Sequence, residues 1–340
     1  MTTPTRSAAD PATIAATRIL LAQIGITTTD LLTHTESAPT FSQAIPKLRT
    51  TLTPGTLRTY NTHLRWLEIA WPHRRLDDIT KAELDQQARH VQASRKTTRG
   101  TRNGASARQH FISAVRCLYR YAEDNNWIHP THNPAARLTM PARPASHRQA
   151  IPSPRLAEIC HIASITGDDR ELDTLLLRLH IETACRRGGA LNLRPCDLDP
   201  HNSLILLREK NGIDRWQPIS PTLTAHLQHH ARQRHSPPEG QLLRYLNGKP
   251  VTRRRYDHLW TRIGTHLPWV AAQHITTHWL RHTTLTWVER AYGYATARAG
   301  HHTRTHGTTA TYVKADLYEI TTALATLTNE PHPLLTHQPN

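Results

Sequence analysis

The sequence has few cysteines and no long apolar run. Its four cysteines form no Cys-x-x-Cys pair and stand at Cys117, Cys160, Cys185 and Cys196. This spacing argues against a zinc ribbon and is typical of a reducing compartment rather than a disulfide framework. No apolar run approaches the length of a membrane-spanning helix. Since no apolar core follows Arg6 near the amino terminus, we expect a cytoplasmic protein without secretion or membrane insertion.

Acidic residues are also scarce. The chain of 340 residues has 26 Asp and Glu against 42 Lys and Arg, which gives a formal net charge of +16. Because Lys and Arg neutralise phosphates and release condensed counterions, a cytoplasmic chain with this charge is expected to bind nucleic acid and to associate with the nucleoid. The alternative at this point is a soluble basic protein without such a partner.

The positive charge is concentrated in two stretches that lack acid altogether. No acidic residue occurs between Asp85 and Glu123, or in residues 125–157. A solvated helix face normally mixes charges of both signs, so these stretches are typical of a surface that faces phosphates. The residues predicted there to contact DNA are Arg95, Lys96, Arg99, Arg102, Arg108, Arg143 and Arg148. On charge alone, a basic run further along is predicted to meet the DNA backbone, namely Arg253, Arg254 and Arg255.

Helix signals dominate the first part of the chain. Asp10-Pro11 can open a short helix, Thr53-Pro54 is an N-cap followed by proline, and Thr80 with Glu83 forms a capping box. A fourth helix is predicted from an apolar stripe at helical spacing, Phe111, Val115, Leu118 and Ala122. A proline-rich, basic segment then favours an extended connector.

The second part is predicted to be helical with a small sheet. Residues 204–207 and 215–219 flank Asn211-Gly212, which is typical of a β-hairpin. Helices are expected to open at Ser153-Pro154, at Ser220-Pro221 and near Thr252. The fold class is therefore mainly α with a small β-sheet. The expected divisions are an N-terminal segment with a short helix (1–39), a helical DNA-binding domain (40–135), a basic Pro-rich linker (136–152), a catalytic domain (153–328) and a tail (329–340).

Four short elements follow one another in the second part. The first is Thr183-Ala184-Cys185-Arg186, and the second is Lys210 on the predicted hairpin. The third is His278-Trp279-Leu280-Arg281-His282, and the fourth is Gly300-His301 followed by Tyr312. Each element alone is a weak signal, but their order and spacing together are specific.

This set resembles the tyrosine recombinases, the lambda-integrase-like and Xer-like family. The resemblance runs by motif over about residues 150 to 327, and by domain order it extends to about residue 40. It implies an all-helical, SAM-like core-binding domain followed by a mixed α/β catalytic domain. It also implies the catalytic residues Arg186, Lys210, His278, Arg281 and His301, with Tyr312 as the nucleophile.

Further expectations follow from the same resemblance. They are cleavage and rejoining of double-stranded DNA through a covalent 3′-phosphotyrosine, without metal, ATP or any cofactor. The protein would act as a tetramer on paired DNA sites and be a monomer or weak oligomer off DNA.

Three positions depart from the family pattern. Ala184 stands where glycine is usual, and Gly189 stands where an acidic residue usually supports the first arginine. The interval from His301 to Tyr312 is slightly longer than in the Xer-like members, which leaves His302 as an alternative to His301.

Elementary chemistry favours the same roles. Cleavage of a phosphodiester without metal needs cations around the equatorial oxygens of its anionic transition state, and a guanidinium presents a rigid, permanently charged fork to two of them. The chain has only six lysines, and Lys210 is the only one between Lys96 and Lys249. Arginine cannot release a proton, so a retained lysine is suited to be the general acid for the departing 5′-oxygen.

Several alternatives stay open at the level of sequence. Tyr292, Tyr294 and Tyr318 compete with Tyr312 as the nucleophile, although only Tyr312 follows Gly-His and Thr-Thr at the matching distance. An apolar stripe after Tyr312 would pack on its own domain or dock on a neighbouring protomer; it consists of Leu317, Ile320, Leu324 and Leu327.

A histidine-rich run is read as a polar helix face rather than a metal site, because no Cys or carboxylate completes a ligand set; it consists of His226, His229, His230 and His235. The rival functions are a DNA-binding relative with impaired catalysis, a type IB topoisomerase-like enzyme, and a basic regulator or RNA-binding protein.

Overall fold

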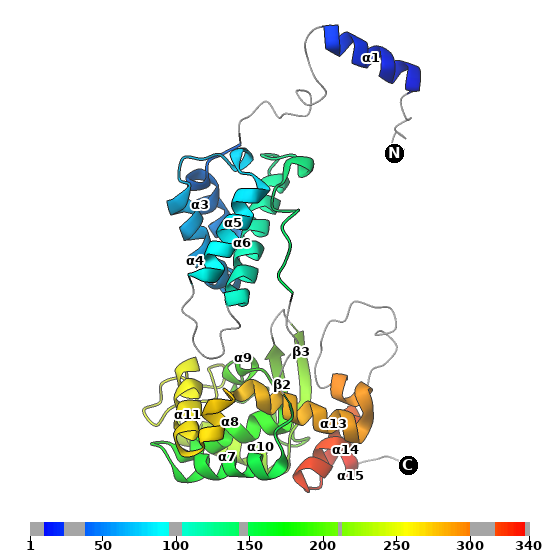
Figure 1. Cartoon of the computed structure of the whole chain (residues 1–340). Helices are drawn as coiled ribbons and strands as arrows, with labels where there is room; N and C mark the ends of the chain where they lie inside the picture. Colours follow the sequence, from blue (N-terminus) through cyan, green and yellow to red (C-terminus); the bar gives the residue numbers. More distant parts are fainter. Residues whose placement is uncertain are drawn as a thin grey trace. The chain divides into compact units, whose positions relative to one another are not determined.

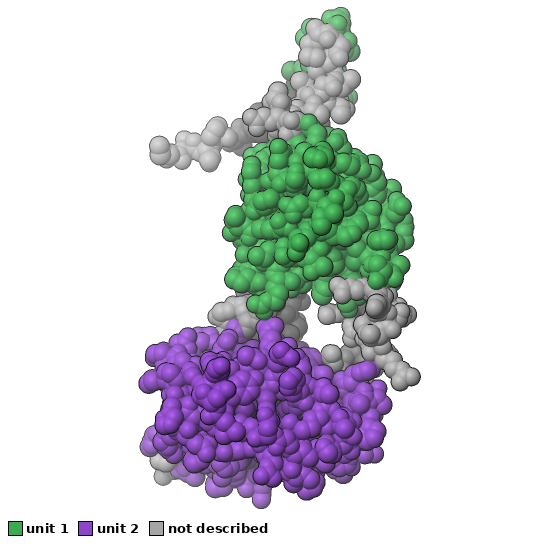
Figure 2. Space-filling view, turned by 90° about the vertical axis from the view of Figure 1, so that its left-hand side faces the viewer, with its two compact units in different colours: residues 1–145 green, residues 146–340 purple. Residues whose placement is uncertain are grey.

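The structure is a computed structural model that describes residues 10–23, 38–94, 104–142, 149–209, 213–299 and 317–336. The chain divides into two compact units, residues 1–145 and 146–340, which are coloured separately in Figure 2. This division lies within residues 136–152, the expected linker, and the domain bounds given above stay a prediction. No helix among the described residues is both long enough and apolar enough to cross a membrane.

The described part of the first unit is entirely helical (Figure 1). Its α-helices are α1 (Pro11–Gln23), α3 (Phe41–Thr51), α4 (Pro54–Ala70), α5 (Lys81–Ala93) and α6 (Ala105–Asp124), with short 3-10 turns at η1 (Leu76–Asp78) and η3 (Pro130–His132). Helix α6 packs against α3, α4 and α5. The predicted stripe of Phe111, Val115, Leu118 and Ala122 is fully buried at this junction. The helical character expected for this unit is therefore confirmed.

The capping signals in the sequence are confirmed in atomic detail. The Thr53 hydroxyl accepts a hydrogen bond from the backbone N–H of Thr56 at the start of α4. Thr80 accepts from the N–H of Glu83, and the Glu83 carboxylate accepts from the N–H of Thr80. These bonds satisfy donors that a helix start leaves without partners, and so they fix where both helices begin.

The second unit combines helices with a small sheet. Its main helices are α7 (Ser153–Ile165), α8 (Arg170–Thr183), α9 (Arg187–Leu191), α10 (Pro221–Gln233), α11 (Arg253–His266), α12 (Pro268–Ala272), α13 (Thr277–Ala299), α14 (Leu317–Thr328) and α15 (Pro333–Thr336). A 3-10 turn, η4 (Pro195–Asp197), precedes the sheet. Helix α13 is two helices joined across a kink at Gly293, whose φ of 84° lies in the left-handed region that favours glycine.

The sheet has the order β1-β2-β3, and both pairs of neighbours are antiparallel. Its strands are β1 (Leu198–Asp199), β2 (Leu204–Glu209) and β3 (Ile213–Pro218). The β2–β3 register runs from Leu204 opposite Pro218 to Glu209 opposite Ile213. The predicted hairpin is therefore present, with both strands extending nearer to its turn than expected.

Two apolar clusters fill the second unit. One joins α8, α9, α10 and the sheet, and includes Leu176, Ile205 and Leu223. The other joins α7, α11 and the start of α13, and includes Ile159 and Ile263. Since α8 contributes to both clusters, it is the central helix against which the remaining elements are positioned.

The end of the chain packs onto the second unit. Helix α14 contacts α8, α13 and β3, and it buries Ala323 and Leu324. Glu330 accepts hydrogen bonds from Arg178 and Thr222. Leu324 of the apolar stripe thus packs on its own domain, whereas Leu317 is exposed, and docking of the stripe on a neighbouring protomer stays a prediction. Within the segment expected as a tail, residues 329–336 are described, and His332 among them is buried.

Candidate active site

A cavity of about 690 Å³ lies where α9, α11 and the start of α13 meet. Its described lining contains four arginines and one histidine but a single carboxylate, that of Asp257. The basic residues are Arg186, Arg187, Arg253, His278 and Arg281. An open cavity with this charge is suited to a phosphodiester rather than to an apolar or cationic ligand.

Arg186 reaches the cavity because the chain turns sharply after α8. Helix α8 ends at Thr183, its C-cap Ala184 has φ 50° and ψ 23°, and Arg186 then forms the N-cap of α9. The Ala184 N–H donates to the His180 carbonyl at 3.0 Å, which closes the last turn of α8. The Ala184 carbonyl accepts a hydrogen bond from the Arg281 guanidinium. A single left-handed residue therefore directs Arg186 outward and holds Arg281 beside it.

The backbone angles of Ala184 explain why the family pattern has glycine at this position. An L-residue in the left-handed region carries a steric cost that glycine does not. We expect Ala184→Gly to raise the free energy of unfolding by about 0.5–1 kcal/mol, after allowance for the greater entropy of glycine in the unfolded chain. Urea denaturation followed by far-UV circular dichroism measures this, and an unchanged or lower midpoint would contradict it.

His278 and Arg281 are brought to the same cavity by the first turn of α13. They stand three residues apart on one helix and therefore on the same side of it. His278 is exposed, whereas Arg281 is buried, and the His278 ring packs edge-on against His282 with centroids 5.9 Å apart. The three predicted catalytic residues that the structure describes, Arg186, His278 and Arg281, are thus brought together.

Burial shapes the electrostatics of the arginine pair. Desolvation and the neighbouring charge of Arg186 lower the pKa of Arg281 to about 10, while Glu209 opposes this change. Arg281 therefore keeps its positive charge at neutral pH, although it is only 4% exposed.

Glu209 is a site residue that sequence reasoning missed. Its carboxylate at the end of β2 accepts hydrogen bonds from both the backbone N–H and the guanidinium of Arg186. The contact joins residues 23 positions apart, so no local sequence pattern predicts it. The only available signal was the absence of an acid at Gly189, which leaves Arg186 in need of a carboxylate from elsewhere.

A buried histidine supports the floor of the site. His180 on α8 has Nδ1 at 3.0 Å from the Cys185 carbonyl and Nε2 at 3.0 Å from the Tyr256 hydroxyl. Because a carbonyl can only accept, Nδ1 carries the proton of the neutral ring and Nε2 accepts from Tyr256. This bridge ties α8 and α11 to the residue that precedes Arg186.

The buried position of His180 predicts loss of stability in acid. Desolvation lowers its pKa to about 4, below the ordinary value near 6.5. A group with a lowered folded-state pKa contributes stability that is complete above the unfolded-state pKa and is lost as pH falls toward the folded-state pKa. Between pH 7 and pH 5 we expect this histidine alone to cost about 2 kcal/mol of unfolding free energy.

The measurement is urea denaturation of wild type and His180→Gln at both pH values. The variant has a lower stability at pH 7 but loses about 2 kcal/mol less than wild type on acidification. Equal losses for the two proteins would contradict the prediction.

The described tyrosines do not offer a nucleophile at the cavity. Tyr256 lines it, but burial raises the pKa of its hydroxyl well above the ordinary value and the hydroxyl is bonded to His180. Tyr292 donates to Thr326 on α14, and neither it nor Tyr294 or Tyr318 lines the cavity. The remaining candidate from the sequence is Tyr312.

Part of the predicted site lies outside the described residues. This applies to Lys210, His301, its alternative His302, and Tyr312. It also applies to six of the predicted DNA contacts, namely Arg95, Lys96, Arg99, Arg102, Arg143 and Arg148. Arg108 is described and lies half-buried on α6.

The basic run at the start of α11 divides between two environments. Arg253 and Arg254 are exposed, and Arg253 lines the cavity, so both remain predicted backbone contacts. Arg255 is buried, and its guanidinium pairs with Asp173 at 2.7 Å and with Asp168 at 2.8 Å. The prediction of a DNA contact is therefore wrong for Arg255, because helical geometry turns it toward α8.

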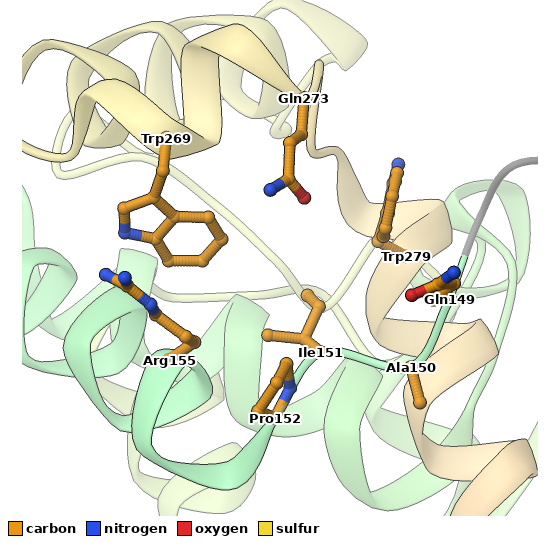
Figure 3. A pocket seen from close by; sticks show the side chains of 8 residues that line it. All are labelled: Gln149, Ala150, Ile151, Pro152, Arg155, Trp269, Gln273 and Trp279. Atoms are coloured by element: carbon orange, nitrogen blue, oxygen red, sulfur yellow. The ribbon is translucent and has the colours of Figure 1, made fainter.

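A second cavity, of about 540 Å³, lies beside the start of α13. Figure 3 shows the side chains of Trp269, Gln273 and Trp279 around this hollow, with Ile151 and Pro152 along its lower side. Arg155 stacks over the Trp269 ring at 5.1 Å from its centroid. Since its lining is mostly aromatic and apolar, it lacks the converging cations of the first cavity.

The histidine-rich helix face has no metal-binding geometry in the part of the chain that is described. No group of three or more His, Cys, Asp or Glu side chains converges there. His230 is buried and accepts from the Arg244 N–H at 3.2 Å, whereas His229 lies 3.7 Å from Glu171. These histidines therefore point to separate partners.

Comparison with known proteins matches part of the chain to a known family. Residues 153–316 match the model of the phage integrase family. No curated protein sequence matches the chain.

Solved structures resemble the chain along most of its length, at low sequence identity. A lambda integrase dimer bound to a COC′ core site is 15% identical, with a TM-score of 0.59 over 90% of this chain and 87% of that one. Tn1549 transposon integrase with circular intermediate DNA is 14% identical, with a TM-score of 0.60 over 86% and 100%. XerH recombinase bound to palindromic difH substrate is 15% identical, with a TM-score of 0.57 over 84% and 85%.

These likenesses confirm the expected fold, and the family match covers Arg186, His278 and Arg281. The second unit therefore carries a domain that matches the phage integrase family, the tyrosine recombinases, over residues 153–316.

Proposed function

We propose that the chain is a site-specific DNA recombinase that cuts and rejoins duplex DNA through a covalent 3′-phosphotyrosine. The observation that carries this proposal is the convergence of Arg186, from the N-cap of α9, with His278 and Arg281, from α13, on one strongly basic cavity. The family match and the DNA-bound states named for the similar structures support it.

The proposed reaction has two steps, cleavage and rejoining, and cleavage comes first. The Tyr312 oxygen attacks the scissile phosphorus, a P–O bond to Tyr312 forms, and the bond from phosphorus to the 5′-oxygen breaks. Arg186 and Arg281 neutralise the non-bridging oxygens, whose charge grows in the transition state. His278 or His301 accepts the phenol proton, and Lys210 supplies a proton to the departing 5′-oxygen.

Rejoining reverses these roles. A 5′-hydroxyl of the partner strand attacks the phosphotyrosine, so that a P–O bond to the 5′-oxygen forms and the P–O bond to Tyr312 breaks. Lys210 takes the hydroxyl proton, and His278 or His301 returns a proton to the Tyr312 oxygen. Because the phosphodiester energy is kept in the covalent intermediate, the proposed reaction needs no ATP. The arginines and Lys210 supply the positive charge that a metal would otherwise provide.

DNA binding is proposed to use both units and more than one copy of the chain. The predicted contacts on the first unit and linker would neutralise backbone phosphates, which position a protein without specifying a sequence. One similar structure is a lambda integrase tetramer bound to a Holliday junction. We propose that this chain likewise assembles as a tetramer on paired sites.

The test is capture of the covalent intermediate in cells. Cells expressing wild type, Tyr312→Phe or the control Tyr318→Phe are lysed in SDS, and the ends of protein-linked DNA are sequenced. The proposal predicts adducts at a discrete locus for wild type and for Tyr318→Phe, and none for Tyr312→Phe. Adducts scattered over the genome would indicate a relaxing, topoisomerase-like enzyme, and DNA binding without adducts would indicate an inactive relative.

A further inference from the structure

One carboxylate contacts both arginines of the candidate site. Glu209 is the last residue of β2, and its side chain is 5% exposed. Its Oε1 accepts from the Arg186 backbone N–H at 3.1 Å, and its Oε2 accepts from the Arg186 guanidinium. The same Oε1 lies 3.9 Å from a terminal nitrogen of Arg281.

Gly189 lies next to this carboxylate. It is buried on α9, and a Cβ placed on it would lie 3.6 Å from Glu209 Oε1 and 3.7 Å from Glu209 Cγ. A methyl group fits at that distance, but a longer side chain would occupy the space of the Glu209 carboxylate. An acidic side chain at position 189 and the Glu209 carboxylate would therefore occupy the same space. In this chain the carboxylate comes from β2 rather than from α9.

The charges around Glu209 explain what its carboxylate does. Two guanidinium groups held close together repel each other, and Arg281 is in addition almost wholly removed from water. Burial alone would raise the pKa of Glu209, but the hydrogen bonds and charge of Arg186, together with the charge of Arg281, outweigh burial and lower it. Glu209 is therefore ionised at neutral pH and offsets the repulsion between the two arginines.

The geometry also leaves donors for a ligand. The Glu209 contacts to the Arg186 guanidinium use one terminal nitrogen, and the Arg186 side chain, which lines the cavity, is 41% exposed. A guanidinium has five N–H donors, so one edge can be fixed by a carboxylate while another meets a phosphate. Such fixation reduces the rotamer freedom that would otherwise be lost on binding DNA.

We propose that Glu209 is the positioning residue of this site, which orients Arg186 and Arg281 toward the scissile phosphate and takes the place of the acidic side chain absent at Gly189. The inference rests on the proposed function and deepens it. It assigns no proton transfer and no substrate contact to Glu209. Since Lys210 follows directly in the sequence, Glu209 also anchors the strand end that leads to the proposed general acid.

The first experiment compares Glu209→Gln with Glu182→Gln on a DNA site recovered from the covalent capture. Glu182 is a matched control, because its side chain is 3% exposed and pairs with Arg178 away from the cavity. For Glu209→Gln we expect single-turnover cleavage to fall about 10- to 100-fold while the affinity for DNA is unchanged or higher, since a negative charge has been removed. Glu182→Gln keeps the wild-type cleavage rate.

Relocation of the carboxylate then separates positioning from a merely structural role. The double variant Gly189→Asp with Glu209→Gly moves the acid from β2 to α9. Glu209→Gln lowers the logarithm of the cleavage rate, and we expect the double variant to regain at least a third of that decrease. Unchanged or faster cleavage by Glu209→Gln would overturn the proposal and indicate that the carboxylate restrains Arg186. A correctly folded double variant as slow as Glu209→Gln would overturn it as well.

A measurement that does not depend on catalysis separates the test of Glu209 from the test of the proposed function. The side-chain N–H signals of Arg186 and Arg281 are assigned by NMR through Arg→Lys variants, and their hydrogen exchange is measured without DNA. The proposal predicts exchange about ten times faster in Glu209→Gln than in wild type. Equal exchange rates would overturn the positioning role even if the chain recombines DNA, whereas absence of adducts from wild type would instead refute the proposed function.

Discussion

Arg186→Gln is expected to lower the rate of DNA cleavage by about 100- to 1000-fold, the usual cost of removing one preorganised donor from a developing oxyanion. Arg186 lines the basic cavity with Arg281, and its guanidinium is held by Glu209. Binding of the intact site should weaken far less, because many other phosphate contacts persist. Single-turnover cleavage and equilibrium binding, measured at one salt concentration, separate the two effects.

Arg194→Gln is the matched control for this prediction. The Arg194 side chain has the same exposed fraction as that of Arg186, 41%, but it pairs with Glu239 outside the cavity. The Arg194→Gln substitution removes the same charge from the chain as Arg186→Gln and should change the cleavage rate less than threefold. If both variants slow cleavage equally, Arg186 acts only through net charge, and the site assigned here is wrong.

Asp173→Ala is expected to destabilise the second unit by about 3–5 kcal/mol. Asp173 on α8 is fully buried, and its two oxygens each lie 2.7 Å from nitrogens of Arg255. Arg262 donates to it as well. Removal of the carboxylate leaves buried guanidinium charge with too few partners, which costs far more than the loss of a surface pair. Chemical denaturation followed by tryptophan fluorescence gives the free energy of unfolding.

The comparison variant for Asp173→Ala is Glu239→Ala. Glu239 belongs to an exposed ion pair, with its own side chain 76% accessible, so its removal should cost less than about 1 kcal/mol. Similar losses for the two variants would show that burial does not set the energy of the Asp173 cluster.

Local signals in the sequence located most of the elements. Thr53-Pro54 and the Thr80–Glu83 pair mark helix starts that depend only on neighbouring residues, and both form as expected. Asn211-Gly212 predicted a hairpin, and the flanking strands pair in the register described. These features were predictable because their energetics are local.

Long-range contacts were the part that the sequence did not reveal. Arg255 was read from a run of charge as a surface residue, yet it stands four residues before buried Leu259 on the inner side of α11. Glu209 lies next to Lys210 in the sequence, but its partners on α9 and α13 come together only in the folded chain. A buried ion pair needs partners from distant elements, and a single sequence does not show which ones meet.

Mass spectrometry of the trapped adduct identifies the nucleophile of the cleavage reaction directly. Wild-type protein linked to DNA is digested with nuclease and protease, and the peptide that carries the nucleotide is sequenced. We expect a nucleotide attached through its 3′-phosphate to the oxygen of Tyr312. Attachment to another side chain, or to a 5′-phosphate, would contradict it.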